Sequence, residues 1–351
     1  MSKNDDAIIN RFNKLFKGDE QSIKKIPLDI NDKYALFSDL HLGDGGKADN
    51  FVRNEETMVF AIKYYKDNEY SIIFLGDVEE LWQFDFIKIR DRYDKSIYEL
   101  LKSFPDNKVH RIFGNHDVEW KRPPDPILSN ENVQPGAPEA IMLGDYIFLV
   151  HGHQGDQLWN KNIWVSSLLA RGAKSFVPTE RFLGNENRSI TESQIPKNRE
   201  RLYYNWAVDN KIILICGHTH RAIFASRSYY GWLKEQIKQK ESEKKRSSAD
   251  KAKLKKLSKD IKKLKINLHI EERMGRDINP LVTKGKPLPC YFNTGSGLYR
   301  KGITNIEIER DKIRLIKWHN NNSFPLEERR IKLWEDGNLS EFREKLNIKT
   351  V

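Results

Sequence analysis

Residues 34–42 read YALFSDLHL, a short apolar run that leads directly into Asp39 and His41. Two later strand-like runs, 71–75 and 109–113, are also followed by glycine and polar residues. Between these runs the apolar residues have helical spacing, and strands that alternate with helices predict a layered α/β fold. Open α/β sheets bind their ligands at the carboxyl ends of the strands, so we expect a functional site where these runs end.

Further strands and two helical insertions are predicted along the rest of the chain. Residues 140–150 have the pattern of a β-hairpin whose second strand runs into His151. Residues 157–210 are helical in character and predict a cap over the site. The other predicted elements are helices at 55–66 and about 80–102, strands at 211–216, 222–226, 290–293, 303–308 and 312–318, and a helical C-terminal extension at 321–351.

Five strand ends carry clusters of histidine, aspartate and asparagine. Any one cluster could equally cap a helix or fill a polar turn. Five together predict a metal site, because carboxylates and imidazoles suit manganese, iron or zinc. Asp77 stands alone on its strand end, and its two carboxylate oxygens suit a ligand that bridges two ions. The clusters are Asp39-Leu40-His41, Gly76-Asp77, Gly114-Asn115-His116-Asp117, His151-Gly152-His153 and Gly217-His218-Thr219-His220.

The order of these clusters resembles the calcineurin-like metallophosphoesterase superfamily. The matching blocks are Asp39-x-His41, Gly76-Asp77-x-x-Glu80, Gly114-Asn115-His116-Asp117, His151 and Gly217-His218-Thr219-His220. The resemblance implies a four-layer α/β/β/α sandwich over residues 1–320. Two predicted helical insertions interrupt it and are not part of the resemblance, a cap at 157–210 and a basic insertion at 229–270.

The resemblance also implies a role for each site residue. One cation would be held by Asp39, His41, Asp77 and His220, and a second by Asp77, Asn115, His151 and His218. His116 would not be a ligand but would protonate or stabilise the leaving oxygen, with Asp117 holding its orientation. Arg221 is expected to contact the substrate, and His153 is expected either to do so or to support a ligand. Glu80 and Asp44 are expected as hydrogen-bond partners of ligands or as loop caps.

The implied chemistry is hydrolysis of a phosphate monoester or diester by hydroxide generated at two divalent cations, with manganese favoured over iron or zinc. The nearest branch looks like UDP-2,3-diacylglucosamine pyrophosphatase. That enzyme, however, carries arginine where this chain has His116, and it lacks the long basic segment. A nucleotide-sugar pyrophosphatase and a nuclease remain alternatives on the same metals. A non-catalytic interaction module on the same fold is the alternative of another class.

Most of the net charge of +11 lies in one segment, residues 234–265, which begins with Lys234 and ends with Lys265. This segment has 14 Lys or Arg against 5 Asp or Glu, a net charge of +9 that leaves +2 for the rest of the chain. Its leucines have helical spacing, and Ser247-Ser248 could mark the bend of a helical hairpin. The segment is either a solvated arm that packs on itself or on a second subunit, or a contact for nucleic acid or an anionic surface.

The sequence shows neither an apolar run of signal-peptide length at its start nor a stretch of about 20 apolar residues that could cross a bilayer. Cys216 and Cys290 are its two cysteines, each in an apolar strand-like segment, which is compatible with a reducing compartment. We therefore expect a cytoplasmic protein. The sequence does not decide its oligomeric state.

Overall fold

The computed structural model describes residues 3–18, 22–129, 135–156, 194–246, 251–273, 281, 286–321, 325, 328–333 and 336–348. The helical elements are α1 (Lys3–Phe16), η1 (Val52–Asn54), α2 (Glu55–Asp67), α3 (Phe86–Tyr93), η2 (Asp94–Tyr98), α4 (Glu99–Lys102), η3 (Val118–Lys121), α7 (Gln194–Asp209), α8 (Tyr229–Arg246), α9 (Lys251–Arg273) and α10 (Leu339–Lys345). None of the helices in these ranges is long and apolar enough to cross a membrane.

The strands form two sheets of seven strands each within the described residues. The first sheet has the order β1 (Ile23–Ile26), β5 (Ala140–Leu143), β6 (Ile147–Val150), β7 (Ile213–Cys216), β10 (Tyr291–Asn293), β8 (Ile223–Phe224) and β9 (Arg227–Ser228). The second has the order β13 (Arg330–Lys332), β12 (Lys312–Trp318), β11 (Ile303–Glu309), β2 (Lys33–Phe37), β3 (Ser71–Leu75) and β4 (Val109–Ile112), with β14 (Gly337–Asn338) beside β12.

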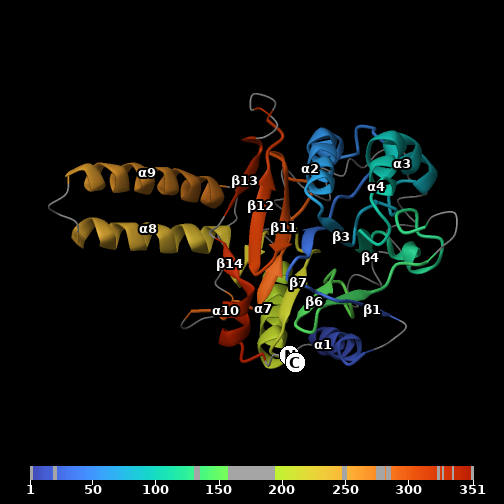
Figure 1. Ribbon diagram of the computed structural model, residues 1–351, viewed down its shortest axis with the longest axis horizontal. Helices are drawn as coiled ribbons and strands as arrows, with labels where there is room; N and C mark the ends of the chain where they lie inside the picture. The colour runs from blue at the N-terminus through green and yellow to red at the C-terminus, as the bar shows by residue number, and fades with distance from the viewer. Residues whose placement is uncertain are drawn as a thin grey trace.

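The two sheets pack on each other, and helices cover their outer faces (Figure 1). Side chains alternate between the faces of a strand, so Leu36 of β2 and Ile73 of β3 belong to the core shared with the first sheet. Their neighbours Phe37 and Ile72 point the other way and pack with residues of α2 and η2. The expected mixed α/β sandwich with two sheets is therefore confirmed.

Two elements at the amino end were not predicted from the sequence. Helix α1 covers the outer face of the first sheet, where Phe12 stacks on Tyr203 of α7 at 5.4 Å between ring centroids and meets Trp206 edge-on at 5.3 Å. Strand β1 pairs in parallel with β5 and extends that sheet by one strand. Its sequence, IKKI, is too short and too polar to have a clear strand pattern, so its pairing depends on the neighbouring strand.

The predicted strands agree closely with β2, β3, β4, the β5–β6 hairpin, β7, β8, β10, β11 and β12. The helix expected at about 80–102 begins only at α3 and continues through η2 and α4. Most of the expected cap, 157–193, lies outside the described residues, and its last part is α7. Cys216 and Cys290 are buried and free, as their apolar surroundings indicate.

The C-terminal extension at 321–351, expected to be helical, contains two short strands as well as a helix in its described part. Strands β13 and β14 pair with β12 before the chain turns into α10. The edge of the second sheet supplies hydrogen-bond partners to these short segments, which have no strand pattern of their own.

The basic insertion is a helical hairpin of α8 and α9, which extends away from the two sheets as an arm (Figure 1). Leu233 and Ile237 of α8 and Leu257 and Ile261 of α9 are buried in an arm that is otherwise largely exposed. The predicted bend at Ser247-Ser248 lies outside the described residues.

Candidate metal centre

The predicted ligands follow five strands whose carboxyl ends meet at one edge of the sandwich. Asp39 and His41 follow β2, Asp77 follows β3, and Asn115 follows β4. These three strands run parallel to one another in the second sheet. In the first sheet β6 and β7 are also parallel. They are followed by His151 and by His218 and His220 respectively.

The backbone is in the left-handed region at five of the seven predicted ligands, where side chains other than glycine are uncommon. Such conformations cost about 1–3 kcal/mol each, persist only where the surrounding structure holds them, and cluster at functional sites. Backbone hydrogen bonds between loops provide that hold, for example from His41 N to the carbonyl of Asp77 at 3.0 Å. The five φ angles are Asp39 54°, His41 51°, Asp77 53°, His218 68° and His220 54°.

Two glycines allow the ligand loops to approach one another. A Cβ atom at Gly114 would lie 2.1 Å from Oδ1 of Asp77. A Cβ atom at Gly217 would lie 2.4 Å from Oγ of Ser38 and 2.6 Å from Oδ2 of Asp39. Any larger residue at either position would displace a carboxylate of the cluster. Close packing therefore explains why glycine occupies these two positions.

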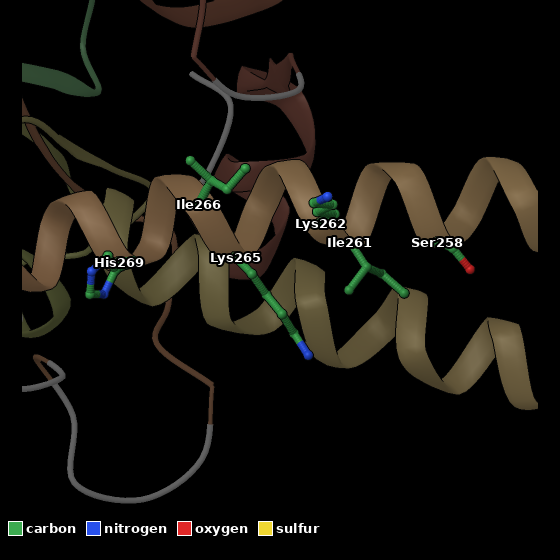
Figure 2. A pocket seen from close by; sticks show the side chains of 6 residues that line it. All are labelled: Ser258, Ile261, Lys262, Lys265, Ile266 and His269. Carbon is green, nitrogen blue, oxygen red and sulfur yellow. The ribbon is translucent and has the colours of Figure 1, made fainter.

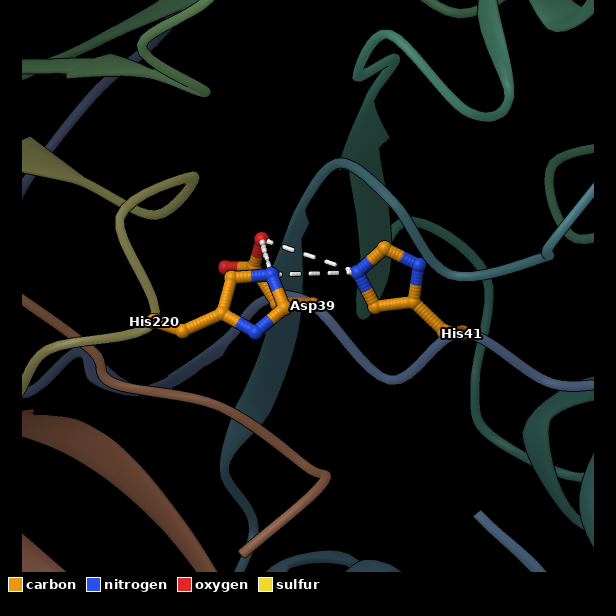
Figure 3. A group of neighbouring side chains, drawn as sticks. All are labelled: Asp39, His41 and His220. Carbon is orange, nitrogen blue, oxygen red and sulfur yellow. Dashed lines mark hydrogen bonds and ion pairs between the residues drawn. The ribbon is translucent and has the colours of Figure 1, made fainter. Parts of the chain in front are cut away.

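Asp39, His41 and His220 form the first half of the centre (Figure 3). Nε2 of His41 lies 3.2 Å from Nε2 of His220, which in turn lies 3.2 Å from Oδ1 of Asp39. All three side chains are buried. Burial by itself raises the pKa of Asp39, but the neighbouring His220 and His151 outweigh it and lower that pKa to about 2. The carboxylate is therefore ionised at neutral pH.

Asp77, His151, Asn115 and His218 form the second half. Nε2 of His151 lies 3.1 Å from Oδ2 of Asp77 and 3.2 Å from Oδ1 of Asn115. A ligand atom of His218 lies within 4.8 Å of those of Asp77 and His151. Oδ2 of Asp77 is also 3.9 Å from Nε2 of His41 in the first half. Asp77 thus lies between the two halves, where a bridging ligand would be.

The hydrogen-bond partners of the ring nitrogens indicate that the centre suits cations. Nδ1 of His151 lies 2.7 Å from the carbonyl oxygen of Leu75, which can only accept, so Nδ1 carries a hydrogen. In the neutral ring Nε2 is then an acceptor, yet it faces two further acceptors, the oxygens of Asp77 and Asn115. Likewise Nδ1 of His41 donates to Oε2 of Glu80 at 2.9 Å, which directs the lone pair of Nε2 at His220. Acceptors that converge at such distances need a positive charge between them.

The raised pKa of His151 also indicates that the centre suits a cation. Burial by itself lowers the pKa of His151, but Asp77 and Asp39 outweigh it and raise that pKa to about 9. A proton on His151 therefore supplies positive charge to the cluster. Divalent cations bind deprotonated ligands and would replace that proton.

His116 lies beside the centre and is held by Glu80. Its Nδ1 is 2.8 Å from Oε1 of Glu80, whose other oxygen accepts from His41. Trp82 stacks on the ring, with 3.5 Å between centroids. Burial lowers the pKa of His116, but Glu80 and Asp77 outweigh it, and the net shift is upward. The two carboxylates therefore stabilise the imidazolium form, which can donate a proton from Nε2.

The expectation that Asp117 orients the His116 ring is corrected by these contacts. The ring is bonded to Glu80, which had been expected only as a ligand partner or loop cap. Asp117 instead accepts hydrogen bonds from Val78 N at 2.8 Å and Gly114 N at 2.6 Å and pairs with Arg111. It acts on the backbone that carries Asp77 and Asn115, because these donors lie in the same two loops.

A buried ionic network beneath the loops was missed by sequence reasoning. Arg111 of β4 is fully buried and contacts the carboxylates of Glu79, Asp117 and Asp125. Trp120 donates to Glu79 at 3.0 Å. An arginine inside the predicted strand 109–113 was the available signal, because a buried arginine needs carboxylate partners.

Three further residues had been singled out from the sequence. His153 is buried beside His151, with 5.3 Å between ring centroids, and burial lowers its pKa to about 3. Arg221 is buried, and its Nη1 lies 3.1 Å from Oε2 of Glu200. Asp44 caps its own loop by accepting from Gly46 N at 2.9 Å. His153 therefore lies at the centre, whereas the charge of Arg221 is matched by Glu200.

Comparison with known proteins adds one match. A family model described as calcineurin-like phosphoesterase matches residues 33–222. The matched segment is more than half of the chain and contains all seven predicted ligands together with His116. No match is found among the curated proteins.

Proposed function

The chain belongs to the calcineurin-like phosphoesterase family, and from that premise we propose that it hydrolyses a phosphate ester with two divalent cations. The observation that carries the proposal is the convergence of ionised carboxylates and imidazole lone pairs on the space around Asp77. Hydrogen bonds to Leu75 and Glu80 direct these lone pairs inward. Such partners are typical of histidines that ligate metals.

We assign the ligands to two overlapping sets. Asp39, His41, Asp77 and His220 would hold one cation, and Asp77, Asn115, His151 and His218 the other. Asp77 is common to both sets because its Oδ2 is near both His41 and His151. Two divalent cations held there would supply an activated water nucleophile and neutralise charge on a phosphoryl group. Manganese is the proposed metal, with iron and zinc as alternatives, because carboxylate and imidazole ligands suit all three.

His116 is proposed as the group that assists the leaving oxygen. Glu80 holds the Nδ1 proton and stabilises the positive ring, which leaves the Nε2 proton for transfer to the departing alcohol. General acids of this kind contribute about 10²–10⁴ in rate. Asp117 acts indirectly, by fixing the loops through Val78 and Gly114. His153 is proposed as a substrate contact, because it lies beside His151 and its buried Nδ1 has no partner among the described residues.

The substrate class is proposed as a phosphate monoester or diester. A nuclease and a nucleotide-sugar pyrophosphatase would use the same ligands, so the ligands do not separate these activities. The resemblance to the UDP-2,3-diacylglucosamine pyrophosphatase branch likewise stays a proposal, and His116 in place of arginine argues against that enzyme itself. The cytoplasmic location also stays a prediction.

The test compares p-nitrophenyl phosphate, bis-p-nitrophenyl phosphate and DNA as substrates of protein that has been stripped of metal and reloaded with manganese, iron or zinc. We expect hydrolysis only of reloaded protein, with two metal equivalents per chain by elemental analysis. The matched control is Asp44→Asn, which removes a carboxylate from the same loop as His41 but not from the cluster, and which should keep full activity. A protein that binds no metal and hydrolyses none of the three would be the non-catalytic module instead.

A further inference from the structure

The arm formed by α8 and α9 has no part in the proposed metal centre. Its apolar residues are used within the arm, since Leu257 and Ile261 are 5% and 8% exposed. Ion pairs join the two helices, from Lys240 to Asp260 at 3.4 Å and from Lys265 to Glu241 at 2.7 Å. The two helices therefore hold each other without needing a partner.

The acidic side chains of the arm form ion pairs with basic residues of the arm or at its base. In addition to the two pairs between α8 and α9 given above, Glu243 pairs with Lys253 at 3.0 Å, and Glu235 pairs with Arg227. These four are the acids of residues 229–246 and 251–269, where the structure describes the side chains. No carboxylate in these ranges is left to neutralise the other lysines of α9.

Six lysines lie on the side of α9 that faces away from α8. At 100° per residue they lie within about 140° of one another, and the centre of this sector is roughly opposite Leu257, Ile261 and Leu264. Each of the six is exposed, and none has an ion pair within 4 Å among the described residues. We call this set the lysine face, and it consists of Lys251, Lys255, Lys256, Lys259, Lys262 and Lys263.

We propose that the lysine face binds the phosphate backbone of double-stranded nucleic acid. Lys251, Lys255, Lys259 and Lys263 follow one another at four-residue steps, which are about 6 Å each, so the row is about 18 Å long. A duplex carries one phosphate per about 3.4 Å on each strand, so the row spans about five base pairs. This row of uncompensated cations winds about 120° around α9 and can contact several successive phosphates of such a polymer, whereas a single small anion would need only one or two of the lysines.

A bilayer surface fits the arm less well. A helix that lies in a membrane interface places its apolar face among the lipids, but the apolar face of α9 is packed on α8. Among the described residues of the arm, Ile266 is the one large apolar side chain that is strongly exposed, at 53%. It borders a shallow apolar hollow lined by Ser258, Ile261, Lys262, Lys265, Ile266 and His269 (Figure 2).

Single-stranded nucleic acid fits less well for another reason. Its binding sites stack bases on aromatic side chains, and residues 233–273 contain neither phenylalanine, tyrosine nor tryptophan. A duplex offers its phosphates without requiring stacking. The inference does not depend on the hydrolase proposal, because the lysine face contains none of the metal ligands.

The test measures binding of the full chain to a labelled duplex of about 20 base pairs by fluorescence anisotropy, over a salt range of about 50–200 mM. With six phosphate contacts the affinity should fall about 2,000-fold over that range, which corresponds to a log–log slope of about −5. In the variant Lys255→Gln/Lys259→Gln/Lys263→Gln the slope should drop to about −3 and the fall to about 40-fold.

The matched control is Lys63→Gln/Lys88→Gln/Lys95→Gln, which removes the same charge from exposed lysines of α2, α3 and η2. It should keep the wild-type slope, and both variants should hydrolyse p-nitrophenyl phosphate as the wild type does. Absence of duplex binding at low salt, or an equal loss in the control, overturns the proposal. So does a result in which vesicles of phosphatidylcholine and phosphatidylserine, and not the duplex, bind through the three lysines.

Discussion

Replacement of Glu80 by glutamine tests whether this carboxylate couples the proposed ligand His41 to the proposed leaving-group acid His116. The carboxylate accepts from Nδ1 of His41 at 2.9 Å and from Nδ1 of His116 at 2.8 Å, and it is 5% exposed. Burial raises its pKa, but His116 and then His41 outweigh this and lower the pKa to about 2. Glu80 is therefore fully charged at neutral pH, and glutamine would keep its shape and remove its charge.

The expected shift in the pKa of His116 follows from its hydrogen bond to Glu80. A hydrogen bond to a charged group contributes about 1.5–3 kcal/mol, which corresponds to about 1–2 pKa units. The pKa of His116 should fall by that amount in Glu80→Gln, because the imidazolium form loses the charge that stabilises it. Activity that needs protonated His116 is present below its pKa and lost above it. The alkaline limb of the pH profile should therefore move to lower pH by about 1–2 units.

The assay is kcat against pH for two substrates, p-nitrophenyl phosphate and an alkyl phosphate monoester. Nitrophenolate leaves without a proton, so Glu80→Gln should slow the alkyl ester more than the nitrophenyl ester. Metal content is measured in parallel, because loss of a partner of His41 should also weaken cation binding about 10–100-fold. Glu80→Asp serves as the control that restores the charge. An unmoved alkaline limb with both metals bound, or equal losses on both substrates, would refute the reasoning.

The other predictions concern the ligands, the buried network and the stability. Asp77→Ala should lose both cations and all turnover. His116→Ala should keep both cations and lower turnover about 10²–10⁴-fold. Equal metal loss in the two variants, measured by elemental analysis, would contradict the assignment of Asp77 as a ligand and His116 as an acid. The pKa of His151 is raised to about 9, so metal binding at pH 7 should release protons, and the metal affinity should increase as pH rises toward 9. Calorimetry in buffers of different ionisation enthalpy measures this proton release. Arg111→Met leaves three buried carboxylates without their cation and should destabilise the protein by about 3–5 kcal/mol in urea unfolding, and a loss below about 1 kcal/mol would mean that the network contributes little. Burial, with Lys24 adding to it, lowers the pKa of His110 to about 4. The stabilisation from the neutral ring is complete above about pH 6.5 and is lost as pH falls toward 4, by about 3 kcal/mol, and His110→Gln should remove this part of the pH dependence of unfolding.

The strand ends and their ligands could be predicted from sequence because both are local properties. Runs such as 34–37 and 72–75 are apolar throughout, which is typical of strands buried on both faces, and the polar residues come directly after them. Parallel strands bring those ends to one edge, so Asp39 and Asp77 had to meet wherever the strands paired. The basic hairpin was visible for the same reason, since its apolar stripe repeats at helical spacing.

The partners of those ligands were decided only by the tertiary structure. Glu80 could have capped a loop, and its position between His41 and His116 depends on how the loops after β2, β3 and β4 fold over one another. The link from Arg111 to Asp125 was likewise decided by the tertiary structure, because a buried arginine indicates that carboxylate partners are needed but not which ones.

The pairing of the short strands at the sheet edges was also determined by the tertiary structure. Strands β1, β13 and β14 have no periodic pattern, and they are strands because a neighbouring edge offers them backbone hydrogen bonds. An apolar run contains the information about its own burial. A short polar segment does not, since its conformation is chosen by the hydrogen-bond partners that the rest of the fold places beside it.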